Sequence, residues 1–179
     1  MKRKTLIMPV VSIALTAVVL LGARTAFSGM AQKNAQAELA RTVAFMLPES
    51  QSFTEEVYEG DDASISRVFR GETGSVIETV TSGYAGDIVM LVGVSKDGKV
   101  TGVTVRDLSE TWGLGARALT ETPFLIQLLG TQGDAEVGTN VDALTGATVT
   151  SKAIARGINA AVGYVTGVDT SSGATSWGG

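Results

Sequence analysis

The sequence predicts an α+β protein in which an N-terminal transmembrane helix precedes a small antiparallel sheet with flanking helices. Three observations support this fold class. Residues 5–23 form an uncharged and mostly aliphatic run, four later segments are short and rich in β-branched residues, and further stretches show the apolar spacing of amphipathic helices.

The run at residues 5–23 is just long enough to cross a membrane, because about 20 helical residues span the hydrocarbon core of a bilayer. Residues 1–4 form a basic tip, and basic residues mark the cytoplasmic side of a membrane helix. We therefore expect a single-pass anchor in the cell inner (cytoplasmic) membrane, with the chain after Arg24 on the periplasmic or extracellular side. A cleaved signal peptide is the alternative, but the apolar run is longer than a typical signal core.

Residues 24–62 are expected to form a juxtamembrane helix and a linker. Apolar residues recur at helical spacing from Ala31 to Leu47, and Pro48 should end that helix because proline breaks the backbone hydrogen-bond ladder. The stretch from Gln51 to Asp62 is polar and acidic, which indicates a loop or linker before the sheet.

The main domain is expected at residues 63–166. Strands are predicted at residues 64–70, 76–81, 87–95 and 100–106, with Lys96-Asp97-Gly98-Lys99 as a hairpin turn between the last two. Thr122-Pro123 should open a helix that runs to Leu129 and ends at Gly130. Residues 134–140 could be a short strand or a loop, and residues 167–179 are expected to be a flexible tail.

The most informative stretch runs from Asn140 to Ser151 and leads into an amphipathic helix. Thr150 or Ser151 is a plausible N-cap, so the free N–H groups of the first helical turn would point back towards Thr148. Such a helix start can bind a phosphate, and the small residues Gly146 and Ala147 would let a bulky ester approach the backbone. On local grounds alone, a capped helix after a tight turn is the commoner interpretation.

Composition removes several kinds of chemistry. The chain has no cysteine and no histidine, which excludes disulfides, cysteine-based metal or iron–sulfur sites, and histidine-dependent acid–base catalysis. We find no catalytic residue set and no metal site, so any redox activity must come from a bound organic cofactor. Beyond the basic tip the chain is acidic, which argues against nucleic acid as a partner because phosphates would repel it.

Two glycine-rich segments interrupt the predicted sheet, at residues 82–87 and 110–117. Taken singly, each is most simply a turn or bulge. Together with the Thr148 turn they offer three loops that could meet at one edge of the sheet. Tyr84 and Trp112 could then stack on a planar ring.

These residues carry a resemblance to a known family. The segment from Asp142 to Thr148 is similar to the Asp-x-x-Ser/Thr-Gly-Ala-Thr/Ser signature of FMN-binding domain proteins. The two glycine segments and the Lys96–Lys99 hairpin follow in the order found in the G subunit of the Rnf electron-transport complex. The C subunit of the sodium-pumping NADH:quinone oxidoreductase shares the signature.

The resemblance implies that an ApbE-type flavin transferase joins FMN to the Thr148 hydroxyl through a phosphodiester, with FAD as donor. It also implies roles around that bond. Asp142 would order the turn or be read by the transferase, and Thr145 or Thr150 would donate to the phosphate oxygens. The flavin itself would be bordered by further residues: Tyr84, Glu110, Trp112, Gly113, Leu114 and Gly115.

The function implied by the resemblance is electron transfer by covalently bound FMN in an ion-translocating ferredoxin:NAD⁺ oxidoreductase of the membrane, with the other Rnf subunits as partners. A C subunit of the quinone-reducing pump, or a stand-alone flavinylated carrier outside the membrane, is the alternative. An anchored module that binds a ligand without redox chemistry is the rival from another class.

This sequence departs from the family pattern at Trp112, where a proline is usual, at Ser109, where a histidine is common, and at Asp87. A second copy of the motif ends at Thr175 in the tail. Only a few residues follow Thr175, so that copy lacks the helix start that would hold a phosphate. We therefore expect attachment at Thr148.

Overall fold

The computed structural model describes residue 16 and residues 29–108, 115–116 and 121–168, and divides the chain into two compact units, Met1–Arg41 and Thr42–Gly179. Residues 29–46 are helical, and this helix ends just before Pro48. No helix within the described residues is both long and apolar enough to span a membrane. Nearly all of the anchor expected at residues 5–23 lies outside them, as does most of the tail expected at residues 167–179.

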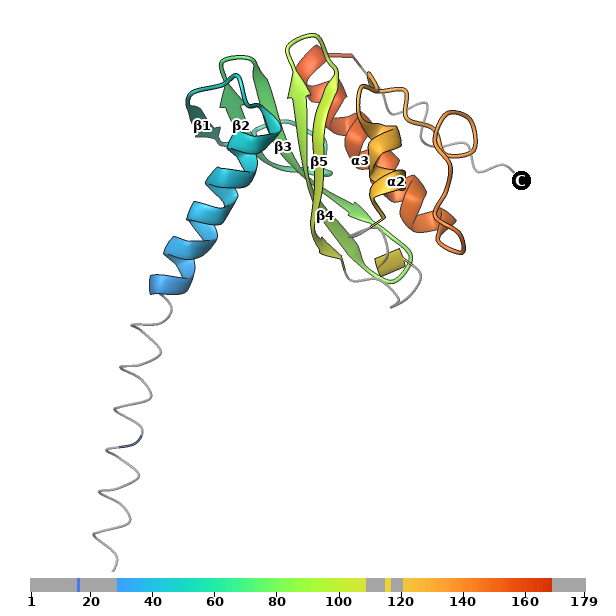
Figure 1. Ribbon diagram of the computed structural model, residues 1–179, viewed down its shortest axis with the longest axis horizontal. Coiled ribbons are helices and arrows are strands. Elements are labelled where there is room, and N and C mark those ends of the chain that lie inside the picture. Colours follow the sequence, from blue (N-terminus) through green and yellow to red (C-terminus); the bar gives the residue numbers. More distant parts are fainter. Residues whose placement is uncertain (1–15, 17–28, 109–114, 117–120, 169–179) are drawn as a thin grey trace, which may run out of the picture. The chain divides into compact units, whose positions relative to one another are not determined.

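The second unit contains a five-stranded antiparallel sheet in the simple order β1-β2-β3-β4-β5 (Figure 1). This confirms the antiparallel sheet with flanking helices that the sequence predicts. The strands are β1 (Phe53–Glu56), β2 (Ile65–Gly71), β3 (Gly74–Ser82), β4 (Asp87–Ser95) and β5 (Val100–Leu108).

The first strand corrects one expectation from the sequence. The stretch from Gln51 to Asp62 is not loop throughout, because β1 pairs with β2 from Phe53↔Gly71 to Glu56↔Val68. The expected strand or loop at residues 134–140 is a loop with one isolated bridge, Val137↔Val141. The predicted helix after Thr122-Pro123 is present as α2 (Thr122–Leu128).

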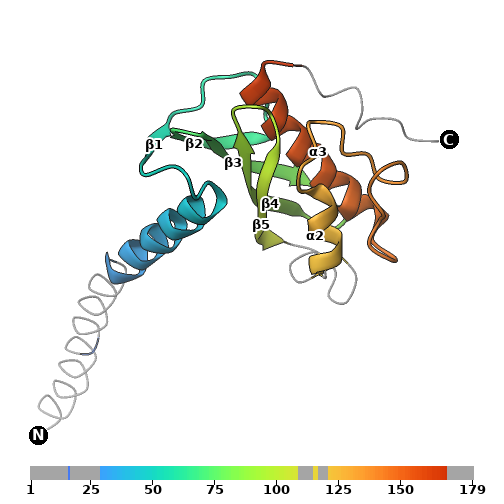
Figure 2. The ribbon, with the colours of Figure 1, turned by 45° about the horizontal axis from the view of Figure 1, so that its top comes forward.

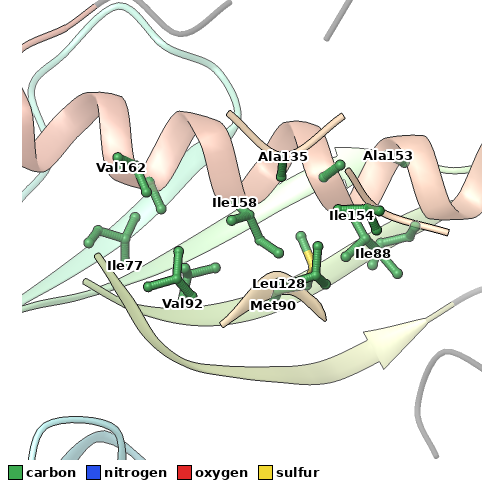
Figure 3. Close-up of a cluster of buried hydrophobic side chains, with 14 of the residues drawn as sticks. Ile77, Ile88, Met90, Val92, Leu128, Ala135, Ala153, Ile154, Ile158 and Val162 are labelled. Atoms are coloured by element: carbon green, nitrogen blue, oxygen red, sulfur yellow. The ribbon is translucent and has the colours of Figure 1, made fainter. Parts of the chain in front are cut away.

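The long helix α3 (Thr148–Thr166) lies along one face of the sheet and closes the main core (Figure 3). Ile154, Ile158 and Val162 on α3 are fully buried, as are the strand residues opposite them. The side chains of this core that lie outside α3 include Ile77, Ile88, Met90 and Val92 on the strands, Leu128 on α2 and Ala135 in a loop. Because burying each large apolar side chain contributes about 1.5–3 kcal/mol, this layer holds α3 in place.

Helix α3 comes close to the sheet at Gly157. A Cβ added there would collide with the Met90 Cε and lie 2.9 Å from the Thr79 Oγ1. The absence of a side chain at Gly157 therefore sets how near the helix comes to β3 and β4.

The other face of the sheet carries both an apolar and a charged region. Met46 lies over the paired residues Gly93 and Gly102, where an added Cβ would come within 3.0 Å and 3.1 Å of the Met46 side chain respectively. Farther along, the buried Glu78 accepts a hydrogen bond from Arg106 Nη1 at 2.9 Å. Arg67 pairs with Glu55 at 2.7 Å and lowers the pKa of that carboxyl below its ordinary value.

Candidate functional site

Three parts of the chain reach the same end of the sheet (Figures 1 and 2). The turn between β3 and β4 is closed by a hydrogen bond from Gly83 N to Gly86 O at 2.8 Å. The end of β5 lies beside it, because Leu108 pairs with Ile88. Helix α3 is tied to the same turn by Arg156, whose Nη2 donates to the Ser82 carbonyl at 3.0 Å.

Thr148 is the first residue of α3 and is exposed to solvent. The N-cap expected at Thr150 or Ser151 is wrong: the N-cap is Ala147, and its side chain makes no capping bond. Thr150 and Ser151 are instead buried within the first turn. Since the first N–H groups of a helix have no partners within it, Thr148 stands directly beside backbone donors that no N-cap side chain occupies.

A tight turn precedes Thr148. The backbone of this turn requires one residue in the left-handed conformation, and Gly146 adopts it with φ of 76°. A hydrogen bond from Ala147 N to the Leu144 carbonyl, at 2.9 Å, closes the turn. Both Gly146 and Thr145 are exposed, whereas Ala147 is buried. The small residues thus present the turn to solvent immediately next to the Thr148 hydroxyl.

Ser151 holds this turn with a single buried hydroxyl. Its Oγ donates to the Ala147 carbonyl at 2.9 Å and accepts from Leu144 N at 2.9 Å. The prediction that Ser151 lies near the start of the helix is correct, but its predicted role as an N-cap is wrong. Its actual bonds run backwards, to the turn that carries Gly146.

Replacing Ser151 with alanine is expected to cost about 1–3 kcal/mol of unfolding free energy, because the buried Leu144 N–H loses the Ser151 hydroxyl as its acceptor. Urea unfolding measures this loss. Thr166→Ala is the matched control: the Thr166 hydroxyl also bonds a carbonyl and an N–H, but Thr166 is exposed, so water can replace it. Equal costs for the two substitutions would contradict this account.

Asp142 opens the turn and is also exposed. Its backbone N–H donates to Gln127 Oε1 on α2 at 2.8 Å. The preceding loop is fastened to α3 by Asn159, which exchanges two hydrogen bonds with the backbone of Ala135, at 3.1 Å and 3.0 Å. Sequence reasoning missed Gln127 and Asn159 because nothing in the local pattern connects them to the turn.

The other residues expected around the flavin are only partly placed. Tyr84 lies on the β3–β4 turn with 74% of its surface exposed. Gly115 is buried in a short 3₁₀ segment. Four expected residues lie outside the described part of the chain: Glu110, Trp112, Gly113 and Leu114.

The charge near Thr148 is partly positive. Lys152 is exposed and stands one turn after Thr148, so both residues share a face of α3. Helical side chains lean towards the N-terminus, which brings the Lys152 ammonium towards Thr148. Among the residues that the structure describes, no group of three or more acidic, histidine or cysteine side chains could hold a metal ion.

Comparison with known proteins agrees with this geometry. The FMN-binding domain family matches residues 83–163, a segment that runs from the β3–β4 turn through the Thr148 turn to near the end of α3. The match confirms the resemblance to that family. The FMN-binding domain segment therefore includes the turn, the attachment motif and the helix that the structure brings together.

Two relatives of the chain are named as subunits of ion-translocating complexes. Over 90 residues the chain is 40% identical to the G subunit of the Na⁺-translocating ferredoxin:NAD⁺ oxidoreductase complex of Acetobacterium woodii, covering 46% of this chain and 44% of that protein. Over 98 residues it is 39% identical to the G subunit of the proton-translocating ferredoxin:NAD⁺ oxidoreductase complex of Clostridium ljungdahlii, covering 51% and 52%. The chain thus matches about half the length of these relatives.

A solved structure is also similar. The crystal structure of NqrC from Shewanella oneidensis is 26% identical in sequence and covers 68% of this chain and 67% of that one, with a TM-score of 0.45.

Proposed function

We propose that this protein carries FMN bound covalently to Thr148 and acts as an electron-transfer subunit of an Rnf-type ion-translocating ferredoxin:NAD⁺ oxidoreductase. The observation that carries the proposal is the exposed Thr148 hydroxyl at the uncapped start of α3, within a segment that matches the FMN-binding domain family. A nucleophilic hydroxyl in this position can accept a phosphoryl group without any rearrangement of the core.

The residues around Thr148 fit a phosphodiester. The start of a helix favours negative charge through its free N–H groups and its dipole, and Lys152 adds a cation on the same face. Thr145 is exposed and can donate to a phosphate oxygen, whereas Thr150 is buried. We therefore assign that contact to Thr145, and the bound flavin supplies the one-electron chemistry that the side chains lack.

Tyr84 is the described side chain best suited to contact the flavin ring. It projects from the β3–β4 turn, which Arg156 ties to α3 two helical turns beyond Thr148. The helical rise between Thr148 and Arg156 is about 12 Å. A flavin ring linked to Thr148 through its ribityl chain would therefore extend along α3 towards the β3–β4 turn that carries Tyr84.

The names of the relatives and the N-terminal sequence support a place for this protein in a membrane complex. Both relatives described above are named as G subunits of ion-translocating complexes, so we propose the other subunits of such a complex as partners. The apolar run at residues 5–23 would anchor the chain, and an ApbE-type flavin transferase would load the domain outside the membrane.

Intact mass of the chain purified from its native membrane tests the proposal. We expect one FMN adduct, and trypsin should place it on a peptide that ends at Lys152, because Lys152 and Arg156 separate Thr148 from the tail. An unmodified chain would contradict covalent attachment and favour the non-redox binding module. An adduct found only on the peptide from Gly157 onward would move the site to the tail.

A further inference from the structure

The turn that would accept FMN is held at two points, and only one of them lies next to the attachment motif in sequence. We call residues 142–147 the acceptor loop. Ser151 fixes its second half through Leu144 N and the Ala147 carbonyl. Its first residue, Asp142, is held from a different helix by Gln127 Oε1 at 2.8 Å.

The bond from Asp142 to Gln127 has more effect on orientation than on stability. Asp142 is exposed, so water could satisfy its backbone N–H at little cost. The residue before it, Val141, is already fixed by its bond to the Glu136 carbonyl at 3.2 Å and by the bridge to Val137. The peptide that leads into Asp142 is held at both of its polar groups: Gly138 N donates to the Val141 carbonyl at 2.8 Å, and the Asp142 N–H donates to Gln127. Gln127 supplies the second of these two bonds and so limits how far Asp142, with its carboxylate, can turn.

Gln127 is itself held in place before it meets Asp142. Its Nε2 donates to the Pro123 carbonyl one turn earlier in α2, at 3.3 Å. The neighbouring residues Phe124 and Leu128 are buried in the main core and fix the helix against the sheet. The amide thus presents its oxygen to Asp142 from a fixed position, with little conformational entropy left to lose.

We propose that Gln127 is a positioning residue for flavin attachment, acting by orienting Asp142 for the flavin transferase. This inference rests on the proposed function of Thr148. In the attachment step a bond forms between Thr148 Oγ1 and the phosphorus of the FMN half of FAD. The pyrophosphate bond of FAD breaks, AMP leaves, and the hydroxyl proton is released to a base of the transferase. Gln127 touches none of the reacting atoms.

Three variants test the inference in the full chain. Gln127→Met keeps the length of the side chain but removes the acceptor oxygen. Gln127→Glu keeps an acceptor oxygen while losing the donor to Pro123. Ile126→Gln changes the neighbouring residue of α2, which is exposed and has no contact with Asp142 among the described hydrogen bonds, and serves as the control.

Flavin attachment is followed with purified transferase, FAD and Mg²⁺, varying the concentration of the acceptor chain. Gln127→Met should raise the KM for the acceptor about fivefold, the worth of one hydrogen bond, and leave kcat within about twofold. Ile126→Gln should behave as the natural chain does, and Gln127→Glu should raise the KM less than Gln127→Met does, because it keeps the acceptor oxygen but loses the bond to Pro123. An unchanged KM for Gln127→Met, or an equal rise for Gln127→Glu, overturns the inference.

Amide hydrogen exchange supplies a readout that does not depend on the transferase. The Asp142 amide should exchange faster in Gln127→Met than in the natural chain and at an intermediate rate in Gln127→Glu, while the amides in the centre of α3 stay unchanged. Equal Asp142 exchange in the natural chain and in Gln127→Met would overturn the inference even if attachment slowed.

Failure of the inference is separable from failure of the proposed function. If the natural chain is flavinylated at Thr148 and Gln127→Met is equally good as an acceptor, only the role of Gln127 falls. If the natural chain accepts no FMN at all, the proposed function fails and the role of Gln127 falls with it.

Discussion

Thr148→Val is expected to abolish covalent flavin while leaving the domain folded. Valine has nearly the same shape as threonine but no hydroxyl, so no phosphodiester can form. Thr148 is exposed, and exposed substitutions usually change the unfolding free energy by no more than about 0.5 kcal/mol. Co-expression with a flavin transferase, followed by fluorescence of the denatured band and by intact mass, measures the loss.

Two matched variants sharpen this test. Thr148→Ser keeps a hydroxyl at the start of α3 and should retain the adduct. Thr145→Val removes another exposed hydroxyl from the same turn and should also keep the adduct, since Thr145 only assists the phosphate. Full flavin content in Thr148→Val would refute both the site and the covalent bond.

Ile158→Ala is expected to have the largest effect on stability, a loss of about 2–5 kcal/mol of unfolding free energy. Ile158 is fully buried at the centre of the layer between α3 and the sheet (Figure 3), and truncation leaves a cavity that the surrounding strands cannot fill. Domains of this kind are stable by only about 5–15 kcal/mol, so the variant would be close to unfolding. Urea denaturation reports the change as a lower midpoint.

The control for Ile158→Ala comes from the same helix. Val149→Ala also shortens an aliphatic side chain, but Val149 is 37% exposed and should lose far less stability. If both substitutions cost the same, α3 does not pack on the sheet as described. Because Thr148 begins this helix, we also expect Ile158→Ala to reduce flavin loading at temperatures near its lowered midpoint.

Local sequence patterns predict most of the sheet but not its first strand. The segments that form β2 to β5 are rich in β-branched residues and are separated by turn residues. Their strand conformation and their antiparallel order can therefore be predicted from the sequence. Phe53-Thr54-Glu55-Glu56 is short and acidic, and becomes a strand only because β2 offers an edge and Arg67 pairs with Glu55. Such a strand depends on residues distant in sequence and cannot be recognised from its own.

The candidate site likewise contains some residues that the sequence predicts and others that it does not. Thr148, Gly146 and Ala147 are recognisable because the motif is contiguous, and the helix after them has a clear period. The N-cap is predicted wrongly because N-cap positions usually carry a hydroxyl or acidic side chain. In the structure the N-cap is Ala147, and the Ser151 hydroxyl instead bonds the Ala147 carbonyl inside the protein. Gln127 lies on another helix, so its contact with Asp142 follows from tertiary packing alone.

The packing of Met46 against Gly93 and Gly102 determines where a soluble fragment of this protein has to begin. Val43, Met46 and Leu47 are buried, so the chain just before Pro48 belongs to the folded unit that starts at Thr42. A fragment trimmed to the first strand would leave the glycine pair uncovered and expose apolar surface, which favours aggregation. Expression for crystallography or for transferase assays should therefore start upstream of Thr42.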